Sequence, residues 1–150
     1  MNDYTPSAEL IEAVKNFEGG SLTPYKDPVG YWTIGYGHRI FPGGAIPELI
    51  TMKQAEDCLM SDLEMMGRAV SGFVKVPLTQ HQWDALTDFC YNLGASRLQS
   101  STLLKMVNVQ NWPAAQEEIK QWCHAGSSVM EGLVKRRAWE AERLDPNFGA

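Results

Sequence analysis

The sequence predicts a single α+β domain that is mostly helical and carries one small β element near its N-terminus. Helix caps and apolar residues at helical spacing recur over most of the 150 residues, and only the segment 21–38 lacks this period. The composition agrees, since 44% hydrophobic and 21% charged residues are typical of a soluble globular domain. A chain of this length buries about two thirds of the surface that it exposes when unfolded, so it can form its own core.

The N-terminal part is expected to form one helix and a β-hairpin. A helix is predicted over residues 7–17, where Leu10, Val14 and Phe17 share a face and two glycines follow as a stop. Between residues 21 and 38, aromatic and β-branched residues gather around the turn sequence Asp27-Pro28-Val29-Gly30, which favours a hairpin. Residues 39–50 contain two prolines and two glycines and are expected to form a loop.

The rest of the chain is expected to be helical. Thr51 with Gln54, and Thr79 with Gln82, form capping-box patterns that open helices at about 52–73 and 80–93. Further helices are expected over residues 101–108, 111–123 and 131–144.

We therefore expect residues 1–150 to form one domain with two lobes. A β lobe at about 19–50 is joined by a connecting helix at about 52–73 to a helical lobe at about 78–145, and a cleft between the lobes is the expected ligand site.

Charge and cysteine content disfavour several classes of protein. The 13 basic and 18 acidic residues give a net charge of −5, so nucleic acid is not an expected partner. No apolar run approaches the roughly 20 residues of a membrane span, and no secretory signal is recognised, so membrane insertion is not expected. Cys58, Cys90 and Cys123 lie among apolar helical positions and are expected to be reduced core thiols. No ligand spacing predicts a metal, and no cofactor is expected.

The candidate chemistry lies at the end of the first helix and in the hairpin after it. Glu18 follows Phe17 at the helix C-terminus, where the helix dipole and desolvation disfavour a charged carboxyl, so it can stay protonated and act as an acid. Asp27 lies in a more polar turn and is expected to stay ionised, and Thr33 adds a hydroxyl that can orient a water. Two carboxyls in such contrasting environments suit the hydrolysis of a glycosidic bond.

The run from Glu18 to His38 resembles the active-site segment of the phage-type lysozymes, the T-even phage lysozyme family or glycoside hydrolase family 24. In that family a Glu, eight residues, an Asp, five residues and a Thr form the catalytic triad, and Glu18, Asp27 and Thr33 meet these spacings. The surrounding Glu-Gly, Tyr-Lys-Asp, Gly-Tyr-x-Thr-Ile-Gly and Gly-His pieces also match. Residues 79–94, 100–104 and 132–140 extend the resemblance over about residues 8–144.

The resemblance implies a lysozyme-like fold and a muramidase. Glu18 corresponds to the general acid, Asp27 to the residue that positions or deprotonates the attacking water, and Thr33 to the residue that helps hold that water. The implied reaction is hydrolysis of the β-1,4 bond between N-acetylmuramic acid and N-acetylglucosamine in bacterial peptidoglycan. Inversion at the anomeric carbon is expected, because a water must fit between Asp27 and the sugar.

Other residues have two interpretations each. Tyr91 and Asn92 match positions that contact sugar in the family, but Tyr91 can instead lie in the core and Asn92 can cap a helix end. Ser101 and Thr102 match positions that line the cleft, but they can equally be helix N-caps.

Several further residues have expectations of their own. His38 is expected to be structural and paired with a carboxylate, and Arg39 stands where the family has an apolar residue. The resemblance implies that an arginine, Arg136 or Arg137, pairs with Glu18, and pairing with Glu140 on the helix surface is the alternative. The tryptophans are expected to be mostly core residues: Trp32, Trp83, Trp112, Trp122 and Trp139.

The biological use that follows from the resemblance is that of an endolysin. Such a monomer would accumulate in the host bacterial cytoplasm and need a holin to reach the cell wall. The alternatives are an antibacterial effector or a virion-borne enzyme of the same chemistry, a lytic transglycosylase, and a peptidoglycan-binding module without turnover. Retention of Glu18, Asp27 and Thr33 together argues against the binding module, and Asp27 with Thr33 favours water as the nucleophile.

Overall fold

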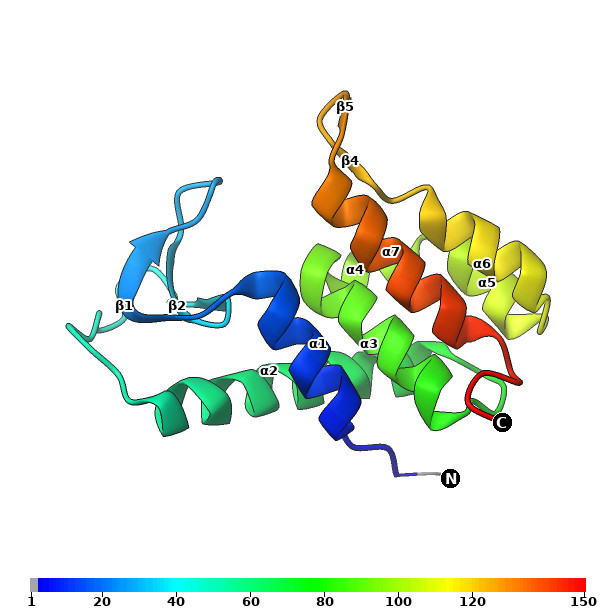
Figure 1. The fold of residues 1–150 in the computed structure, drawn as a ribbon, viewed down its shortest axis with the longest axis horizontal. Helices are drawn as coiled ribbons and strands as arrows, with labels where there is room; N and C mark the ends of the chain where they lie inside the picture. The colour runs from blue at the N-terminus through cyan, green and yellow to red at the C-terminus, as the bar shows by residue number, and fades with distance from the viewer. Residues whose placement is uncertain (1–2) are drawn as a thin grey trace.

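The computed structural model describes residues 3–150 and has the predicted α+β architecture (Figure 1). Seven helices of these residues form most of the molecule: α1 (Ala8–Glu18), α2 (Met52–Phe73), α3 (Gln80–Leu93), α4 (Ala95–Gln99), α5 (Thr102–Asn108), α6 (Trp112–Lys120) and α7 (Glu131–Leu144). Strands β1 (Ser21–Lys26), β2 (Trp32–Gly35) and β3 (His38–Arg39) form one sheet, and β4 (His124–Ala125) and β5 (Ser128–Val129) form another.

The first sheet lies at one end of the molecule and the helices α3 to α7 lie at the other, with α2 running between them (Figure 1). Its three strands are antiparallel in the order β1-β2-β3, so the chain runs back and forth without a crossover. Thr33 on β2 pairs with Tyr25 on one side and with Arg39 on the other. This register places Thr33 in the middle strand, beside the turn that contains Asp27.

The helix boundaries follow the capping signals in the sequence. The Ser7 side chain accepts a hydrogen bond from the Leu10 backbone N–H and begins α1. Thr51 and Thr79 form complete capping boxes at the starts of α2 and α3, as predicted. Gly94, with φ of 100°, ends α3.

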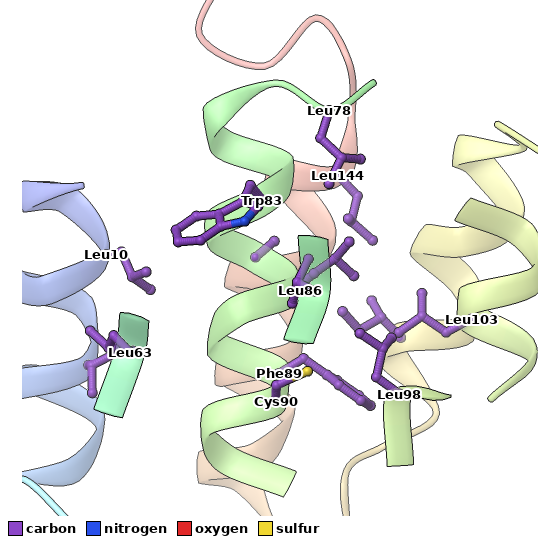
Figure 2. Close-up of a cluster of buried hydrophobic side chains, with 14 of the residues drawn as sticks. Leu10, Leu63, Leu78, Trp83, Leu86, Phe89, Cys90, Leu98, Leu103 and Leu144 are labelled. Atoms are coloured by element: carbon purple, nitrogen blue, oxygen red, sulfur yellow. The ribbon is translucent and has the colours of Figure 1, made fainter. Parts of the chain in front are cut away.

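Helix α3 is the centre of the hydrophobic core (Figure 2). Leu86 and Phe89 on α3 are fully buried, and they are surrounded by apolar side chains of the helices packed around α3. Leu10 of α1 and Leu63 of α2 pack on one side, and Leu103 of α5 packs on another (Figure 2). Because α1 and α7 both lie against this rigid helix, side chains on all three can be held in fixed relation.

Several local expectations are corrected by the structure. Cys58 and Cys123 are partly exposed, and only Cys90 is buried in the core, although all three cysteines are free. Trp32 is 39% exposed, because it lies on a short strand of a small sheet and has only the Lys26 ammonium over its ring.

One expected helix is shorter than predicted, and one hairpin was not predicted. Helix α6 ends at Lys120 instead of at residue 123, and the β4–β5 hairpin lies between α6 and α7, where no element was expected. No helix within residues 3–150 combines the length and the apolar character that a membrane crossing requires.

Candidate active site

Glu18 is the last residue of α1, and its carboxyl is held by an arginine from the opposite end of the chain. Gly19 caps the helix with φ of 64°, a backbone conformation that suits glycine, and this turn lets the chain leave α1 toward β1. The Arg136 Nη1 atom on α7 donates to Glu18 Oε2 at 2.7 Å. Glu18 keeps 23% of its side chain exposed, so it can still meet a ligand. Arg136, rather than Arg137, therefore pairs with Glu18.

Gly37 lies directly against the other oxygen of this carboxyl. A Cβ atom placed on Gly37 would be 3.1 Å from Glu18 Oε1 and 3.4 Å from the Tyr91 hydroxyl. Its φ of 88° is also a conformation that disfavours other residues. Glycine at this position therefore allows the β2–β3 turn to pack against the carboxyl.

Asp27 lies in the turn between β1 and β2, where backbone N–H groups converge on one of its oxygens. Asp27 Oδ1 accepts from the N–H groups of Val29 at 3.0 Å, Gly30 at 2.8 Å and Tyr31 at 2.9 Å. These hydrogen bonds, led by that of Tyr31, lower the pKa of Asp27 despite some desolvation, and the charge of Arg39 adds to the effect. The carboxyl is thus ionised at neutral pH, as the sequence predicted.

The second oxygen of Asp27 accepts none of those backbone hydrogen bonds. Asp27 Oδ2 lies 3.6 Å from Nη2 of Arg39, whose guanidinium stacks on the Tyr31 ring at 4.0 Å from its centroid. Arg39 remains about half exposed, so this is a loose contact compared with the one at Oδ1. Oδ2 is the oxygen through which Asp27 can act on a ligand or a water.

Thr33 is tied to Asp27 through the backbone of Tyr31. The Thr33 hydroxyl donates to the Tyr31 carbonyl at 3.0 Å, and that carbonyl also accepts from the Asp27 N–H at 2.9 Å. Thr33 is only 3% exposed, so its hydroxyl has a fixed orientation. Because its proton is donated to Tyr31, the hydroxyl oxygen remains able to accept a hydrogen bond.

Glu18 and Asp27 both influence Tyr25 on β1, which connects the two carboxyl positions. Burial raises the pKa of Tyr25, and the negative charges of Glu18 and Asp27 raise it further. Glu18 lies against Gly37 in the β2–β3 turn, and Asp27 and Thr33 are joined through Tyr31 at the β1–β2 turn. The structure therefore brings Glu18, Asp27 and Thr33 to the same three-stranded sheet.

The residues expected to contact substrate on α3 have structural contacts of their own. The Tyr91 hydroxyl donates to the Tyr36 carbonyl, and burial is the main reason that the pKa of Tyr91 is raised. Asn92 accepts a hydrogen bond from Nη2 of Arg137 at 2.8 Å and lies inside α3 rather than at its cap. Both side chains are partly exposed.

Ser101 and Thr102 differ in their surroundings. Ser101 is the N-cap of α5: its buried hydroxyl accepts from the Leu104 N–H and donates to the Leu98 carbonyl. Thr102, the first residue of α5, is exposed. The capping interpretation therefore holds for Ser101, whereas the Thr102 side chain is open to solvent.

His38 has the structural role that the sequence predicted. Its Nδ1 atom lies 2.7 Å from Asp62 Oδ2 on α2, and this contact ties the sheet to the long helix. The hydrogen bond to Asp62 outweighs desolvation and raises the pKa of His38. His38 thus anchors the strand that follows Gly37.

Sequence reasoning missed the carboxyls behind Arg136. Asp88 on α3 binds Arg136 through both of its oxygens, with Nε–Oδ2 at 2.9 Å and Nη2–Oδ1 at 2.7 Å. Glu140, fully buried, lies with Arg137 beside this pair instead of on the helix surface. The one available signal was an aspartate on the apolar central helix, since burial of an unpaired carboxylate is costly.

Two hollows in the described part of the chain lie away from this site. A cavity of about 540 Å³ is lined by residues that include Tyr4, Val74, Leu78 and Trp83, at the far end of α2. Among residues 3–150, no three His, Cys, Asp or Glu side chains are grouped so as to hold a metal ion.

Comparisons with known proteins agree on one family. The phage lysozyme family model matches residues 15–140. The endolysin of Bacillus phage PZA is 41% identical over 133 residues, 87% of this chain and 51% of that protein. The endolysin of Acyrthosiphon pisum secondary endosymbiont phage 1 is 37% identical over 138 residues, 89% of this chain and 93% of that protein.

A solved structure with the same fold is the muramidase domain of SpmX from Asticaccaulis excentricus. It superposes with a TM-score of 0.86 at 32% identity, covering 95% of this chain and 98% of that one. The chain spans about half the length of the two Bacillus phage endolysins that it matches.

Proposed function

Because the chain belongs to the phage lysozyme family, we propose that it hydrolyses the β-1,4 bond between N-acetylmuramic acid and N-acetylglucosamine in bacterial peptidoglycan. The observation that carries this proposal is that two carboxyls at the same sheet have different partners, an arginine for Glu18 and backbone N–H groups for Asp27. Asp27 is held ionised by three N–H groups on Oδ1, which leaves Oδ2 available, and Glu18 is oriented by Arg136. One fixed base and one oriented acid are the requirements of glycoside hydrolysis.

In the proposed reaction Glu18 acts as the general acid. It gives its proton to the glycosidic oxygen as the bond between that oxygen and the anomeric carbon breaks. Asp27 Oδ2 takes a proton from a water that attacks the anomeric carbon from the opposite face. The Thr33 hydroxyl oxygen accepts a hydrogen bond from the other O–H of that water, and this hydrogen stays on the new anomeric hydroxyl. The products are two shorter glycan chains, one of which ends in a reducing N-acetylmuramic acid.

Inversion at the anomeric carbon is part of the proposal, because water rather than an enzyme carboxylate is the nucleophile. NMR of fresh digests tests this feature. The α anomer of the new reducing end should form first and then equilibrate, whereas initial formation of the β anomer would contradict inversion.

Tyr91, Asn92 and Thr102 remain proposed substrate contacts, and Ser101 is proposed to line the cleft only through the start of α5 that its buried hydroxyl caps. Among them, Thr102 has an exposed side chain, and Tyr91 is adjacent to Gly37 and so to Glu18. Aromatic faces and polar side chains of this kind suit binding of a sugar. We also propose that residues 1–150 act as one catalytic domain, with the β lobe at about 19–50, the connecting helix at 52–73 and the helical lobe at 78–145.

The proposed biological role is that of an endolysin that lyses a host bacterium. Several relatives carry the name endolysin, which supports this use. We propose that the protein acts as a monomer, accumulates in the host cytoplasm and reaches the wall through a holin. Its three free cysteines support a reducing compartment before release.

The experiment that tests the activity compares Glu18→Gln and Asp27→Asn with a matched control. Glu12→Gln is the control, because Glu12 lies on the same helix as Glu18 but is exposed. Release of soluble fragments from purified peptidoglycan should fall by about 10²-fold to 10⁴-fold in each site variant and stay unchanged in the control. Wild-type rates in Glu18→Gln, with a folded protein by circular dichroism, would contradict the proposal.

A further inference from the structure

Arg136 is almost completely buried, and all of its hydrogen bonds go to carboxyls. It is 5% exposed, Nε and Nη2 are bound by Asp88, and Nη1 is bound by Glu18. Asp88 is 0% exposed. A guanidinium in such a place is stable only when a negative charge stays beside it.

The proposed reaction requires Glu18 to be protonated beside this buried cation. To act as an acid, Glu18 must carry a proton, and it then no longer offers a negative charge to Arg136. If Glu18 were the only anion beside this buried cation, the cation would strongly favour the ionised form of Glu18 and so oppose its role.

We propose that Asp88 is a positioning residue for Glu18, and that it supplies the permanent negative charge that lets Arg136 hold the Glu18 carboxyl in either protonation state. This inference rests on the proposed function. The geometry supports it, because Asp88 binds Arg136 with two parallel hydrogen bonds whereas Glu18 makes one. Asp88 is too deeply buried to touch a substrate, so its effect must pass through Arg136.

The electrostatics of the pair agree with the geometry. Burial disfavours the charge on Arg136, but the contacts of Asp88, followed by those of Glu18, outweigh it and raise the pKa of Arg136. Burial likewise disfavours the charge on Asp88, and hydrogen bonds from Glu140 and Arg136 overcome it and lower the pKa of Asp88. Asp88 is therefore the anion on which Arg136 mainly depends.

Glu140 lies behind Asp88 and has a cation of its own. Its Oε1 atom is 2.7 Å from Nε of Arg137, and its Oε2 atom accepts from Nη2 of Arg137 at 2.9 Å. Complete burial, together with the neighbouring charge of Asp88, raises the pKa of Glu140 despite the two arginines. Glu140 is therefore placed to pair with Arg137, and Asp88 is the carboxyl that binds Arg136.

The other titratable groups that face Glu18 do not replace Asp88. Tyr25 on β1 and Tyr91 on α3 have raised pKa values, mainly through burial, and are neutral phenols near neutral pH. Asp27 and Asp62 also lie in this region, but each has its own partner, Arg39 and His38 respectively.

The experiment measures the pH dependence of kcat and KM for wild type, Asp88→Asn and two comparison variants. Asp84→Asn is the matched control, since Asp84 is also buried on α3 but binds Ser7 and Gln80 instead of Arg136. Glu140→Gln removes the other buried carboxyl of this cluster and leaves Asp88 in place. In Asp88→Asn the alkaline limb of the kcat profile should move to lower pH by about one unit, with KM unchanged.

In Asp84→Asn and Glu140→Gln the alkaline limb of the kcat profile should stay at the pH of the wild type. An unshifted limb in folded Asp88→Asn would overturn the inference, and so would an equal shift in Asp84→Asn. If Asp88→Asn does not fold, Glu140→Gln decides the question: a shifted alkaline limb there would mean that Glu140 carries the charge, against the inference.

A wild type that cleaves no peptidoglycan would instead refute the proposed function. An unshifted alkaline limb in an active, folded Asp88→Asn variant bears on the role of Asp88 alone, so the two failures can be told apart.

Discussion

Replacing Gly37 with alanine tests whether the position of the Glu18 carboxyl limits the reaction. The new Cβ would lie 3.1 Å from Glu18 Oε1, which is tighter than an ordinary contact, so the carboxyl must shift by a few tenths of an ångström. Arg136 resists this shift, because it holds the other oxygen at 2.7 Å.

The expected magnitude has two parts. Alanine at φ of 88° costs about 1–2 kcal/mol of backbone strain, which lowers the Tm by about 2–8 °C in a chain of this size. A misplacement of 1 Å can cost about 100-fold in rate, so a shift of a few tenths should lower kcat by about 5-fold.

Gly43→Ala separates these two effects. Gly43 has a similar φ of 82°, but a Cβ there meets no atom within 4 Å. The assay combines thermal unfolding with kcat on purified peptidoglycan. Both variants should lose Tm, and only Gly37→Ala should lose kcat. Equal kcat in the two variants would refute the reasoning that Glu18 is positioned by this packing.

Three further predictions concern the surroundings of the site. Arg39→Met should move the acidic limb of the kcat profile up by less than about one pH unit, because activity needs ionised Asp27 and Arg39 is the weakest of the causes that lower its pKa. Protonated His38 stabilises the fold, because its pKa is raised in the folded state, and this stabilisation is complete below about pH 6.5. The free energy of unfolding should therefore fall by about 1 kcal/mol as the pH rises through the folded pKa, and denaturant titrations of His38→Asn should lack this step. Ser101→Ala should lower the Tm by about 2–4 °C through loss of the α5 cap, whereas Thr102→Ala should raise KM and leave the Tm unchanged.

The long helices could be predicted because their signals are local. Thr51 and Thr79 each bind a backbone N–H only three residues ahead, so the cap and the helix start lie in one short stretch of sequence. The β4–β5 hairpin was missed for the opposite reason. Strands of two residues, such as His124–Ala125, are too short to show an alternating pattern.

The site could be predicted only where its residues are close in the chain. Asp27 and Thr33 belong to one hairpin, and the turn composition around Asp27 was sufficient to expect an ionised carboxyl. The partner of Glu18 is 118 residues away, and the partner of Arg136 is 48 residues away from it. No local pattern distinguishes Arg136 from Arg137, because that choice depends on how α7 packs against α1 and α3.

Burial also explains the remaining errors. Cys58 and Trp32 have the residue types of a core, but much of the surface of a folded protein is apolar, so their partial exposure costs little. Asp88 has the residue type of a surface and is fully buried, because Arg136 accompanies it.

The most direct test of the central claim is mass spectrometry of peptidoglycan fragments released in water enriched in ¹⁸O. Hydrolysis that uses Glu18 as acid and a water held by Asp27 and Thr33 should give fragments whose reducing N-acetylmuramic acid carries the heavy oxygen, and Glu18→Gln should release almost none. Fragments with anhydro ends and no heavy oxygen would contradict the account, because the nucleophile would then be a hydroxyl of the sugar itself.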